Sequence, residues 1–211
     1  GRRRARRGGR RGDDPSGAPN LQKWLTAAGY HVTNAVDSVL PMLPAALSSS
    51  GQIWHYGIDT TSAEDQDRLE DFVRSGGSLF LTGEWGLGFD NPAALAIIDE
   101  LVSPSIGNAN DSIYPDSLPV NQGAIEGFAT TPNSLTTWDP DLVGGLSGVA
   151  AENSIGTNLG GNAGGAVWKV GAAGRLAILM DVNWAQSVYG NVSTAEPVAV
   201  NLAHFLSLGS S

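Results

Sequence analysis

Residues 62–86, SAEDQDRLEDFVRSGGSLFLTGEWG, constrain the fold of this chain more than any other segment. Residues 62–65 have the pattern of a capping box, which predicts the start of a helix. Gly76-Gly77 predicts its end, and the next five residues, Ser78–Thr82, predict a buried strand. A capped helix that leads into a fully apolar strand is typical of a sheet with helices packed on its faces.

Weaker patterns of the same kind occur along the chain. Residues 52–56 and 175–181 predict two strands parallel to Ser78–Thr82, which we expect between them. Residues 104–170 are rich in Gly, Asn, Pro and Thr and predict an irregular β-rich insertion. The expected fold is therefore α/β, with a mostly parallel sheet flanked by helices. The remaining elements that we expect are helices over 21–28, 92–102 and 196–208, the first capped by Asn20, and a short strand over 30–33.

Charge divides the chain into an arm and a body. Seven of the 12 basic residues lie within residues 1–11, and the following 200 residues carry a net charge of −16. Residues 1–19 lack apolar periodicity and are predicted to be a disordered Arg/Gly-rich arm, whereas residues 20–208 are predicted to be one domain. The arm is either a nucleic-acid-binding segment or an extension unrelated to the fold. Because the acidic body repels polyanions, nucleic acid and membranes are not expected partners.

The chain contains no cysteine, which excludes disulfides, thiolate metal sites and cysteine nucleophiles. The body holds only two lysines, Lys23 and Lys169, and is rich in Asn, Thr and Gly. We interpret this composition as that of a secreted or surface bacterial protein, although no signal peptide is visible before the body.

The order of helix, Gly-Gly, hydrophobic strand and Gly-rich turn in residues 62–86 resembles the class I glutamine-amidotransferase-like superfamily, including its non-catalytic and trehalose-utilisation-like branches. Residues 21–33 are similar to the start of such domains, and the strand from Gly174 with the C-terminal helix is similar to their end. The resemblance implies a flavodoxin-like fold over most of residues 20–208, outside the insertion.

The chain departs from the catalytic members of that superfamily at two places. Their nucleophile elbow is Gly-x-Cys-x-Gly, and the matching stretch here, residues 82–86, places Glu84 at the nucleophile position. A carboxylate there cannot form the thioester that amidotransferases need. The family also has a His and a Glu after its last core strand, where this chain reads Asp181-Val182-Asn183-Trp184. We therefore expect no amidotransferase activity.

The candidate site lies at the carboxyl ends of the predicted strands, where open α/β sheets bind their ligands. Carboxylates and aromatic rings together suit a sugar, because rings stack on its apolar face and carboxylates contact its hydroxyl groups. Alternatively, Glu84 caps a helix and the Trp residues fill the rim of the core. The candidate catalytic residues are Glu84 and Asp181, and the candidate ligand-binding residues are Tyr56, Asp59, Trp85, Asn183 and Trp184.

Several loops contain acidic and amide residues, which are the oxygen ligands that Ca²⁺ prefers. None has the spacing of a known calcium loop, so solvated turns are the alternative interpretation. These candidate loops are Asp90-Asn91, residues 108–111, Asp116 and residues 139–141.

Two functions follow from these observations. The first is a secreted or surface amidotransferase-like domain without amidotransferase activity that binds a small or carbohydrate ligand at the carboxyl ends of the strands. The second is a hydrolase of an ester, lactone or glycoside that uses Glu84 and Asp181, or a bound divalent cation. The three histidines are far apart in the sequence, and no Gly-x-Ser-x-Gly motif supports a serine hydrolase.

Overall fold

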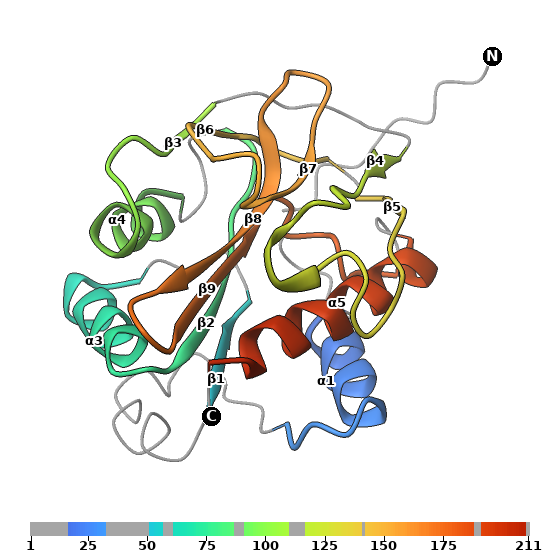
Figure 1. The fold of residues 1–211 in the computed structure, drawn as a ribbon, viewed down its shortest axis with the longest axis horizontal. Coiled ribbons are helices and arrows are strands. Elements are labelled where there is room, and N and C mark those ends of the chain that lie inside the picture. The colour runs from blue at the N-terminus through green and yellow to red at the C-terminus, as the bar shows by residue number, and fades with distance from the viewer. Residues whose placement is uncertain are drawn as a thin grey trace, which may run out of the picture.

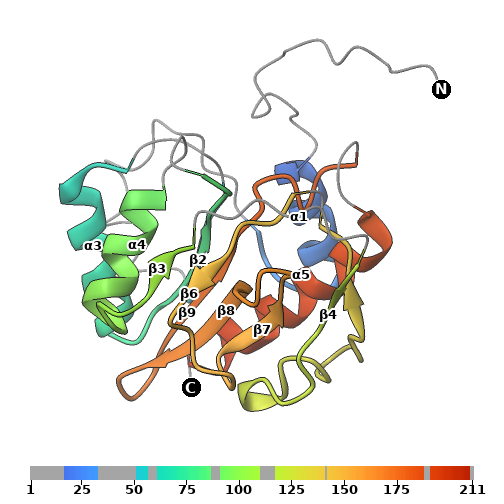
Figure 2. The same ribbon diagram turned by 90° about the horizontal axis from the view of Figure 1, so that it is seen from above.

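The computed structural model describes residues 17–32, 51–56, 61–86, 91–109, 117–140, 142–187 and 191–209. A seven-stranded sheet lies between two pairs of helices (Figures 1 and 2). Helices α3 (Ala63–Arg74) and α4 (Asn91–Leu101) cover one face. Helices α1 (Gly17–Ala27) and α5 (Val192–Ser207) cover the other. The predicted α/β class is confirmed.

The centre of the sheet has the predicted arrangement. Strand β2 (Ser78–Thr82) lies between β1 (Gln52–His55) and β9 (Gly174–Leu179) and is parallel to both. All five residues of β2 and all six of β9 are buried, as expected for strands covered on both faces. Ser62 caps α3 by accepting a hydrogen bond from the Asp65 N–H at 3.2 Å, so the cap at this helix start is confirmed.

The expectation that the sheet is mostly parallel is wrong outside these three strands. Strand β8 (Ala163–Val170) pairs antiparallel with β9 across a turn of only three residues. Such a hairpin needs no crossover helix, whereas each parallel pair does. The predicted insertion therefore ends in a strand of the central sheet, and every further strand is added antiparallel.

The rest of the insertion is short and irregular, as predicted. Strands β6 (Leu146–Ser147) and β3 (Gly107–Asn108) extend the sheet beyond β8, and β7 (Ser154–Thr157) pairs with β8 on a separate branch. Strands β4 (Leu118–Pro119) and β5 (Thr137–Trp138) form a separate ribbon beside α5. The 3-10 helix η2 (Ile125–Gly127) lies between them in sequence.

Three predicted boundaries need correction. Helix α1 begins at Gly17, so residues 17–19 belong to it rather than to the arm, and Asn20 is not its cap. Pro19 is compatible with this earlier start because a first-turn residue needs no N–H partner. Helix α5 begins at Val192, four residues before the predicted start, because Asn191 caps it by accepting from the Ser193 N–H. Residues 30–32 form no strand, and Thr33 lies outside the described residues.

Candidate functional site

Glu84 lies at the carboxyl edge of the sheet, two residues after the end of β2, and is 1% exposed. One carboxylate oxygen accepts the Trp85 N–H at 2.9 Å, and the other accepts the Val182 N–H at 3.2 Å. The side chain therefore joins the turn after β2 to the turn after β9. Backbone N–H groups compensate a buried carboxylate well, since hydrogen bonds to a charged acceptor are strong.

Asp181 is fully buried in the turn that follows β9. Its Oδ1 accepts the Asn183 N–H at 2.7 Å, and the turn is closed by the Gln186 N–H, which donates to the Asn183 carbonyl. Glu84 and Asp181 thus accept from the consecutive N–H groups of residues 182 and 183. The structure brings the two predicted catalytic carboxylates to one turn, where both are shielded from solvent.

Tyr56 and the start of α1 complete this part of the edge. The Tyr56 hydroxyl donates to the Val182 carbonyl at 2.8 Å. Gly17 packs directly on the Tyr56 ring, because a methyl group added at Gly17 would overlap its hydroxyl. Asn20 donates from Nδ2 to the Ala185 carbonyl at 2.8 Å and to Ser187 Oγ at 3.0 Å. The first turn of α1 is therefore bonded to the segment after β9.

Asn91, the first residue of α4, holds the turn after β2 and was not predicted to do so. Its Oδ1 accepts the Glu84 N–H at 2.9 Å, and its Nδ2 donates to the carbonyls of Glu84 and Gly86 at 2.5 and 2.9 Å. Asn108 Nδ2 also donates to the Gly86 carbonyl, at 3.0 Å. Both residues fall in segments that the sequence suggested as calcium loops. In the structure their amide groups bind the backbone of the turn after β2.

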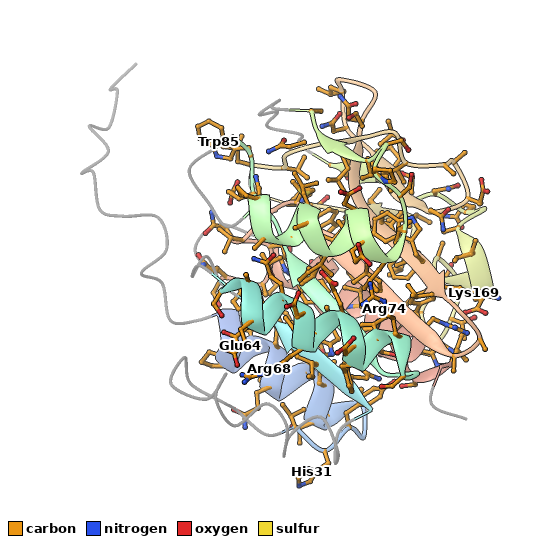
Figure 3. All side chains as sticks on the ribbon, turned by 90° about the vertical axis from the view of Figure 1, so that its left-hand side faces the viewer. His31, Glu64, Arg68, Arg74, Trp85 and Lys169 are labelled. Atoms are coloured by element: carbon orange, nitrogen blue, oxygen red, sulfur yellow. The ribbon has the colours of Figure 1, made fainter. Side chains whose placement is uncertain are left out.

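The predicted ligand-binding residues differ in accessibility. Asn183 and Trp184 are 1% and 0% exposed, and the Trp184 ring packs edge-on against Phe80 at 6.0 Å between centroids. Trp85 and Tyr56 are half-buried, and Figure 3 shows Trp85 at the outer corner of the molecule. Asp59 lies outside the described residues. Trp85 and Tyr56 are thus the predicted aromatic residues that an external ligand can reach.

Three buried polar atoms follow β9 and have no hydrogen-bond partner within the described part of the chain. These atoms are Asn183 Oδ1, Trp184 Nε1 and Gln186 Oε1. A buried amide oxygen without a partner is costly in free energy, so such atoms are uncommon in folded proteins. All three atoms come from a single turn, residues 183–186.

The acidic and amide loops do not gather into a described metal site. In the described ranges, no group of three or more His, Cys, Asp or Glu side chains is placed to hold a metal ion. The described members of the loops instead bond to other parts of the chain: Asn91 and Asn108 as above, and Asp139, whose Oδ2 accepts from Asn191 Nδ2 at 2.8 Å. The remaining candidates Asp90, Asn110, Asp111, Asp116 and Asp141 lie outside the described residues.

A hollow of about 290 Å³ lies between α1 and α5. Its wall includes Trp24 of α1, Ala28 just after that helix, and Pro197 and Val200 of α5, with Glu196 and Asn133 beside them. It contains none of the predicted site residues.

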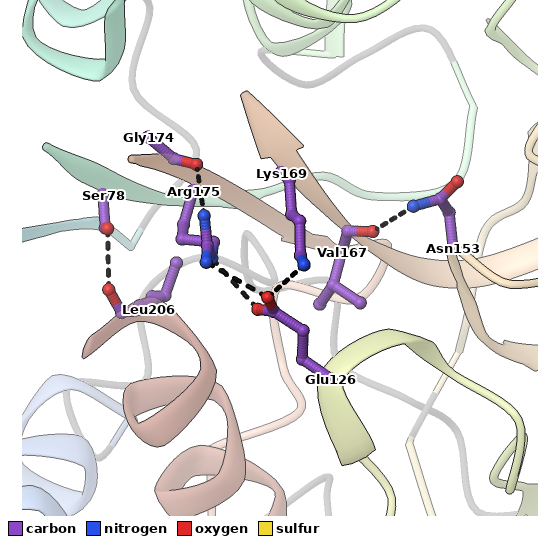
Figure 4. Close-up of polar contacts among 8 residues, drawn as sticks. All are labelled: Ser78, Glu126, Asn153, Val167, Lys169, Gly174, Arg175 and Leu206. Carbon is purple, nitrogen blue, oxygen red and sulfur yellow. Dashed lines mark hydrogen bonds and ion pairs between the residues drawn. The ribbon is translucent and has the colours of Figure 1, made fainter. Parts of the chain in front are cut away.

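At the opposite end of the sheet, Glu126 binds two cations (Figure 4). Arg175 donates to its two oxygens from Nε and Nη2, both at 3.2 Å, and Lys169 forms an ion pair with it. Only 7% of the Arg175 side chain is exposed, and its guanidinium lies 5.8 Å from the centre of the Phe205 ring. Glu126 has a φ of +53°, the only positive value for a non-glycine residue in the described ranges.

Comparison with known proteins establishes the fold and little more. No family model matches the chain, and no curated protein matches it. Among solved structures, the mmIFT52 N-terminal domain is similar over 93% of this chain and 92% of its own, with a TM-score of 0.64 and 17% identity. At this identity the likeness shows that the two share a fold.

Two glycosidases were also found. The exo-β-1,4-mannosidase Op5Man5 from Opitutaceae bacterium strain TAV5 has a TM-score of 0.49 and 14% identity over 95% of this chain. The cold-adapted β-galactosidase from Rahnella sp. R3 has a TM-score of 0.49 and 16% identity over 90%. This chain spans only 33% and 26% of those two proteins, and at these TM-scores neither likeness informs the site.

Proposed function

We propose that the chain is a class I glutamine-amidotransferase-like, flavodoxin-like domain that performs no amidotransferase chemistry and binds a neutral carbohydrate at the carboxyl edge of its sheet. The observation that carries this proposal is the state of Glu84. The residue at the nucleophile position is a carboxylate, 1% exposed, whose two oxygens accept backbone N–H groups. Such a group holds two turns together and is not available to attack a substrate.

The backbone supports the same conclusion. A nucleophile elbow holds its residue in a strained conformation on a sharp turn. Glu84 does not have a positive φ, and the next helix begins only at Asn91. Its N–H and carbonyl are both bonded to the Asn91 side chain, so the turn is fixed in an unstrained form.

Binding rather than catalysis is also supported by which side chains reach the surface. Trp85 and Tyr56 are half-buried at the edge, and an aromatic ring there offers the apolar face on which sugars stack. Asp181 is fully buried, so it contributes to the shape of the edge rather than to contact with a ligand. The acidic, lysine-poor body favours a neutral ligand and, as part of the proposal, a location outside the cell or on its surface.

The test is binding of the full chain to an array of neutral oligosaccharides, followed by calorimetry on any that bind. Trp85→Ala should weaken binding at least about tenfold, which corresponds to about 1.4 kcal/mol. Trp54→Phe is the matched control, because Trp54 is also half-buried but packs on Phe80 at 4.7 Å. Binding that is unchanged in Trp85→Ala, or an array without binders, would contradict the proposal.

Two enzyme assays complete the test. Glutamine hydrolysis above background that is lost in Glu84→Ala would show that the turn after β2 acts as a nucleophile elbow. A screen with ester, lactone and glycoside substrates, with and without EDTA, addresses the hydrolase alternative. Activity that Glu84→Gln abolishes, with the fold unchanged by circular dichroism, would replace the binding proposal with a hydrolase.

A further inference from the structure

The turn after β9 concentrates the unpaired polar atoms of the interior. Of the four buried side-chain atoms without a hydrogen-bond partner in the described ranges, three come from residues 183–186. Asn183, Trp184 and Gln186, which carry them, are 1%, 0% and 2% exposed. A native fold rarely leaves such atoms unbonded, because each loses its hydrogen bonds to water and gains none in return. Three of them within four residues indicate that this turn binds a small guest.

The backbone of the turn brings these side chains together. The Gln186 N–H donates to the Asn183 carbonyl at 2.8 Å, which closes a β-turn over residues 183–186. The first and last Cα atoms of such a turn lie within about 7 Å of each other, so the amide oxygens of Asn183 and Gln186 can reach a common point. Asp181 is joined to the same turn, because its Oδ1 accepts the Asn183 N–H at 2.7 Å.

Two buried carboxylates give this turn a negative charge. Asp181 is 0% exposed, and Glu84, which is 1% exposed, accepts the Val182 N–H at 3.2 Å. A carboxylate has about four lone-pair sites, so it can accept a backbone N–H and still bind a cation. Carboxylate and amide oxygens are the ligands that Ca²⁺ prefers, and it accepts them in flexible geometry, whereas Mg²⁺ needs a near-ideal octahedron and keeps most of its water.

We propose that residues 181–186 hold a Ca²⁺ ion, bound by Asn183 Oδ1, Gln186 Oε1 and the carboxylate of Asp181. The ion is internal, because each of these side chains is 2% exposed or less. Trp184 Nε1 is a donor and cannot bind a cation, so a water molecule of the coordination shell accepts its hydrogen. The ion is separate from the carbohydrate proposed above, and neither proposal requires the other.

Calcium content and thermal unfolding of the full chain test this site. The protein is dialysed against EDTA or against about 1 mM CaCl₂, both in about 0.15 M NaCl, which screens loose binding to the acidic surface. We expect one bound Ca²⁺ per chain by elemental mass spectrometry. The melting temperature should be about 5 °C higher with Ca²⁺ than with EDTA, because a ligand that binds the native state stabilises it. The same concentration of MgCl₂ should give less than half of this shift.

Substitutions locate the ion. Asn183→Leu and Gln186→Leu each remove one oxygen ligand, and both should lose the response to Ca²⁺. Asn183→Asp keeps an oxygen at that position and should retain the response. Asp71→Asn is the matched control, because it removes a carboxylate of α3 whose side chain is 80% exposed, and it should keep the full shift. Each variant is compared with itself in EDTA, so a general loss of stability does not imitate the loss of a ligand.

Two results would overturn the proposal. The first is a wild type that retains no Ca²⁺ and melts at the same temperature in both buffers, because the three atoms would then bind water only. The second is a Ca²⁺ response that persists in both Asn183→Leu and Gln186→Leu, because the ion would then lie elsewhere. Carbohydrate binding that depends on Trp85 tests the proposed function alone, so the two failures are distinguishable.

Discussion

The two ends of the sheet hold carboxylates in different ways. At the carboxyl edge, Glu84 is 1% exposed and is bound by the backbone N–H groups of Trp85 and Val182. At the opposite end, 19% of the Glu126 side chain is exposed, and it is bound by the charged side chains of Arg175 and Lys169. Glu84 is held by backbone N–H groups, whose positions are fixed by the turns. Glu126 is held by charged side chains, which water and salt ions can replace.

The partners of Glu84 and Glu126 predict different responses to salt. Backbone N–H groups are fixed by the turns that carry them, so their bonds to Glu84 should depend little on ionic strength. The pair between Glu126 and Arg175 is a charge pair at the margin of the core, so its energy should fall as salt rises. The two ends can therefore be distinguished by substitution and by salt.

The largest effect is expected for Glu84→Ala. The change removes the acceptor of one buried and one partly buried N–H group, each of which costs about 1–3 kcal/mol when left without a partner, so we expect a loss of about 3–5 kcal/mol. Glu84→Gln keeps one acceptor oxygen and should lose about half as much. Urea denaturation measures both. Glu152→Ala, at an exposed position, is the control and should change stability by less than about 0.5 kcal/mol. A loss below about 1 kcal/mol for Glu84→Ala would show that water replaces the carboxylate.

The charge pair at the other end should give a smaller, salt-dependent effect. In a double-mutant cycle of Glu126→Gln and Arg175→Met, we expect a coupling free energy of about 1–2 kcal/mol at low salt. The coupling should shrink by half or more in about 1 M NaCl, whereas the loss in Glu84→Ala should not change. Urea denaturation at the two salt concentrations measures this. An equal salt dependence at both ends would abolish the distinction between them.

The sequence predicted local periodicity well and long-range polar bonds poorly. The Gly-Gly stop, the buried strand after it and the two parallel neighbours were all predicted, because each depends on a pattern within about ten residues. The side chain of Asn91 was missed although its partners are only five to seven residues away, because amide bonds within a turn leave no periodic pattern in the sequence. The bond between Asn20 and the Ala185 carbonyl joins residues 165 apart, and no local pattern predicts it.

Strand β8 was also poorly predicted, because it depends on pairing with another strand rather than on its own sequence. Its Ala-Gly-Gly-Ala-Val-Trp-Lys-Val sequence begins with four residues of low β preference, so no long strand was predicted within residues 104–170. Pairing with β9 along six residues determines the strand, and that pairing follows from the short turn between them. The candidate carboxylates Glu84 and Asp181 were located from the strand ends, but their burial could not be predicted, because it depends on the packing of separate turns.

A third prediction concerns the backbone conformation of Glu126, at the end of the sheet opposite the carboxyl edge. A φ of +53° is unfavourable for any residue with a Cβ, by roughly 1 kcal/mol relative to Gly. Glu126→Ala and Glu126→Gly both remove the carboxylate, but only the second relieves this backbone conformation. We therefore expect Glu126→Gly to be more stable than Glu126→Ala by about 1 kcal/mol in thermal or urea unfolding. The reverse order would mean that residue 126 leaves this backbone conformation once the carboxylate is removed.

Glu70 of α3 is a third kind of carboxylate, and it should give the smallest effect. It is 8% exposed, and Arg74 lies 3.5 Å from it. Burial raises its pKa above the usual value of 4.5, and the nearby Glu100, Asp67 and Asp71 raise it further, although Arg74 opposes them. The cost of burying the charged form of Glu70 is therefore only partly offset by Arg74.

The raised pKa determines the sign of the pH dependence. The native state holds the Glu70 proton more tightly than the unfolded state, so ionisation destabilises the protein as pH rises above 4.5. Glu70→Gln removes that penalty and should stabilise the protein at pH 7 by up to about 0.5 kcal/mol, with no gain below pH 4.5, where both states are protonated. Urea unfolding of both proteins across this range measures the difference. A variant less stable than the wild type at pH 7 would show that the Arg74 ion pair outweighs the cost of burial, and Glu70 would then belong with Glu126.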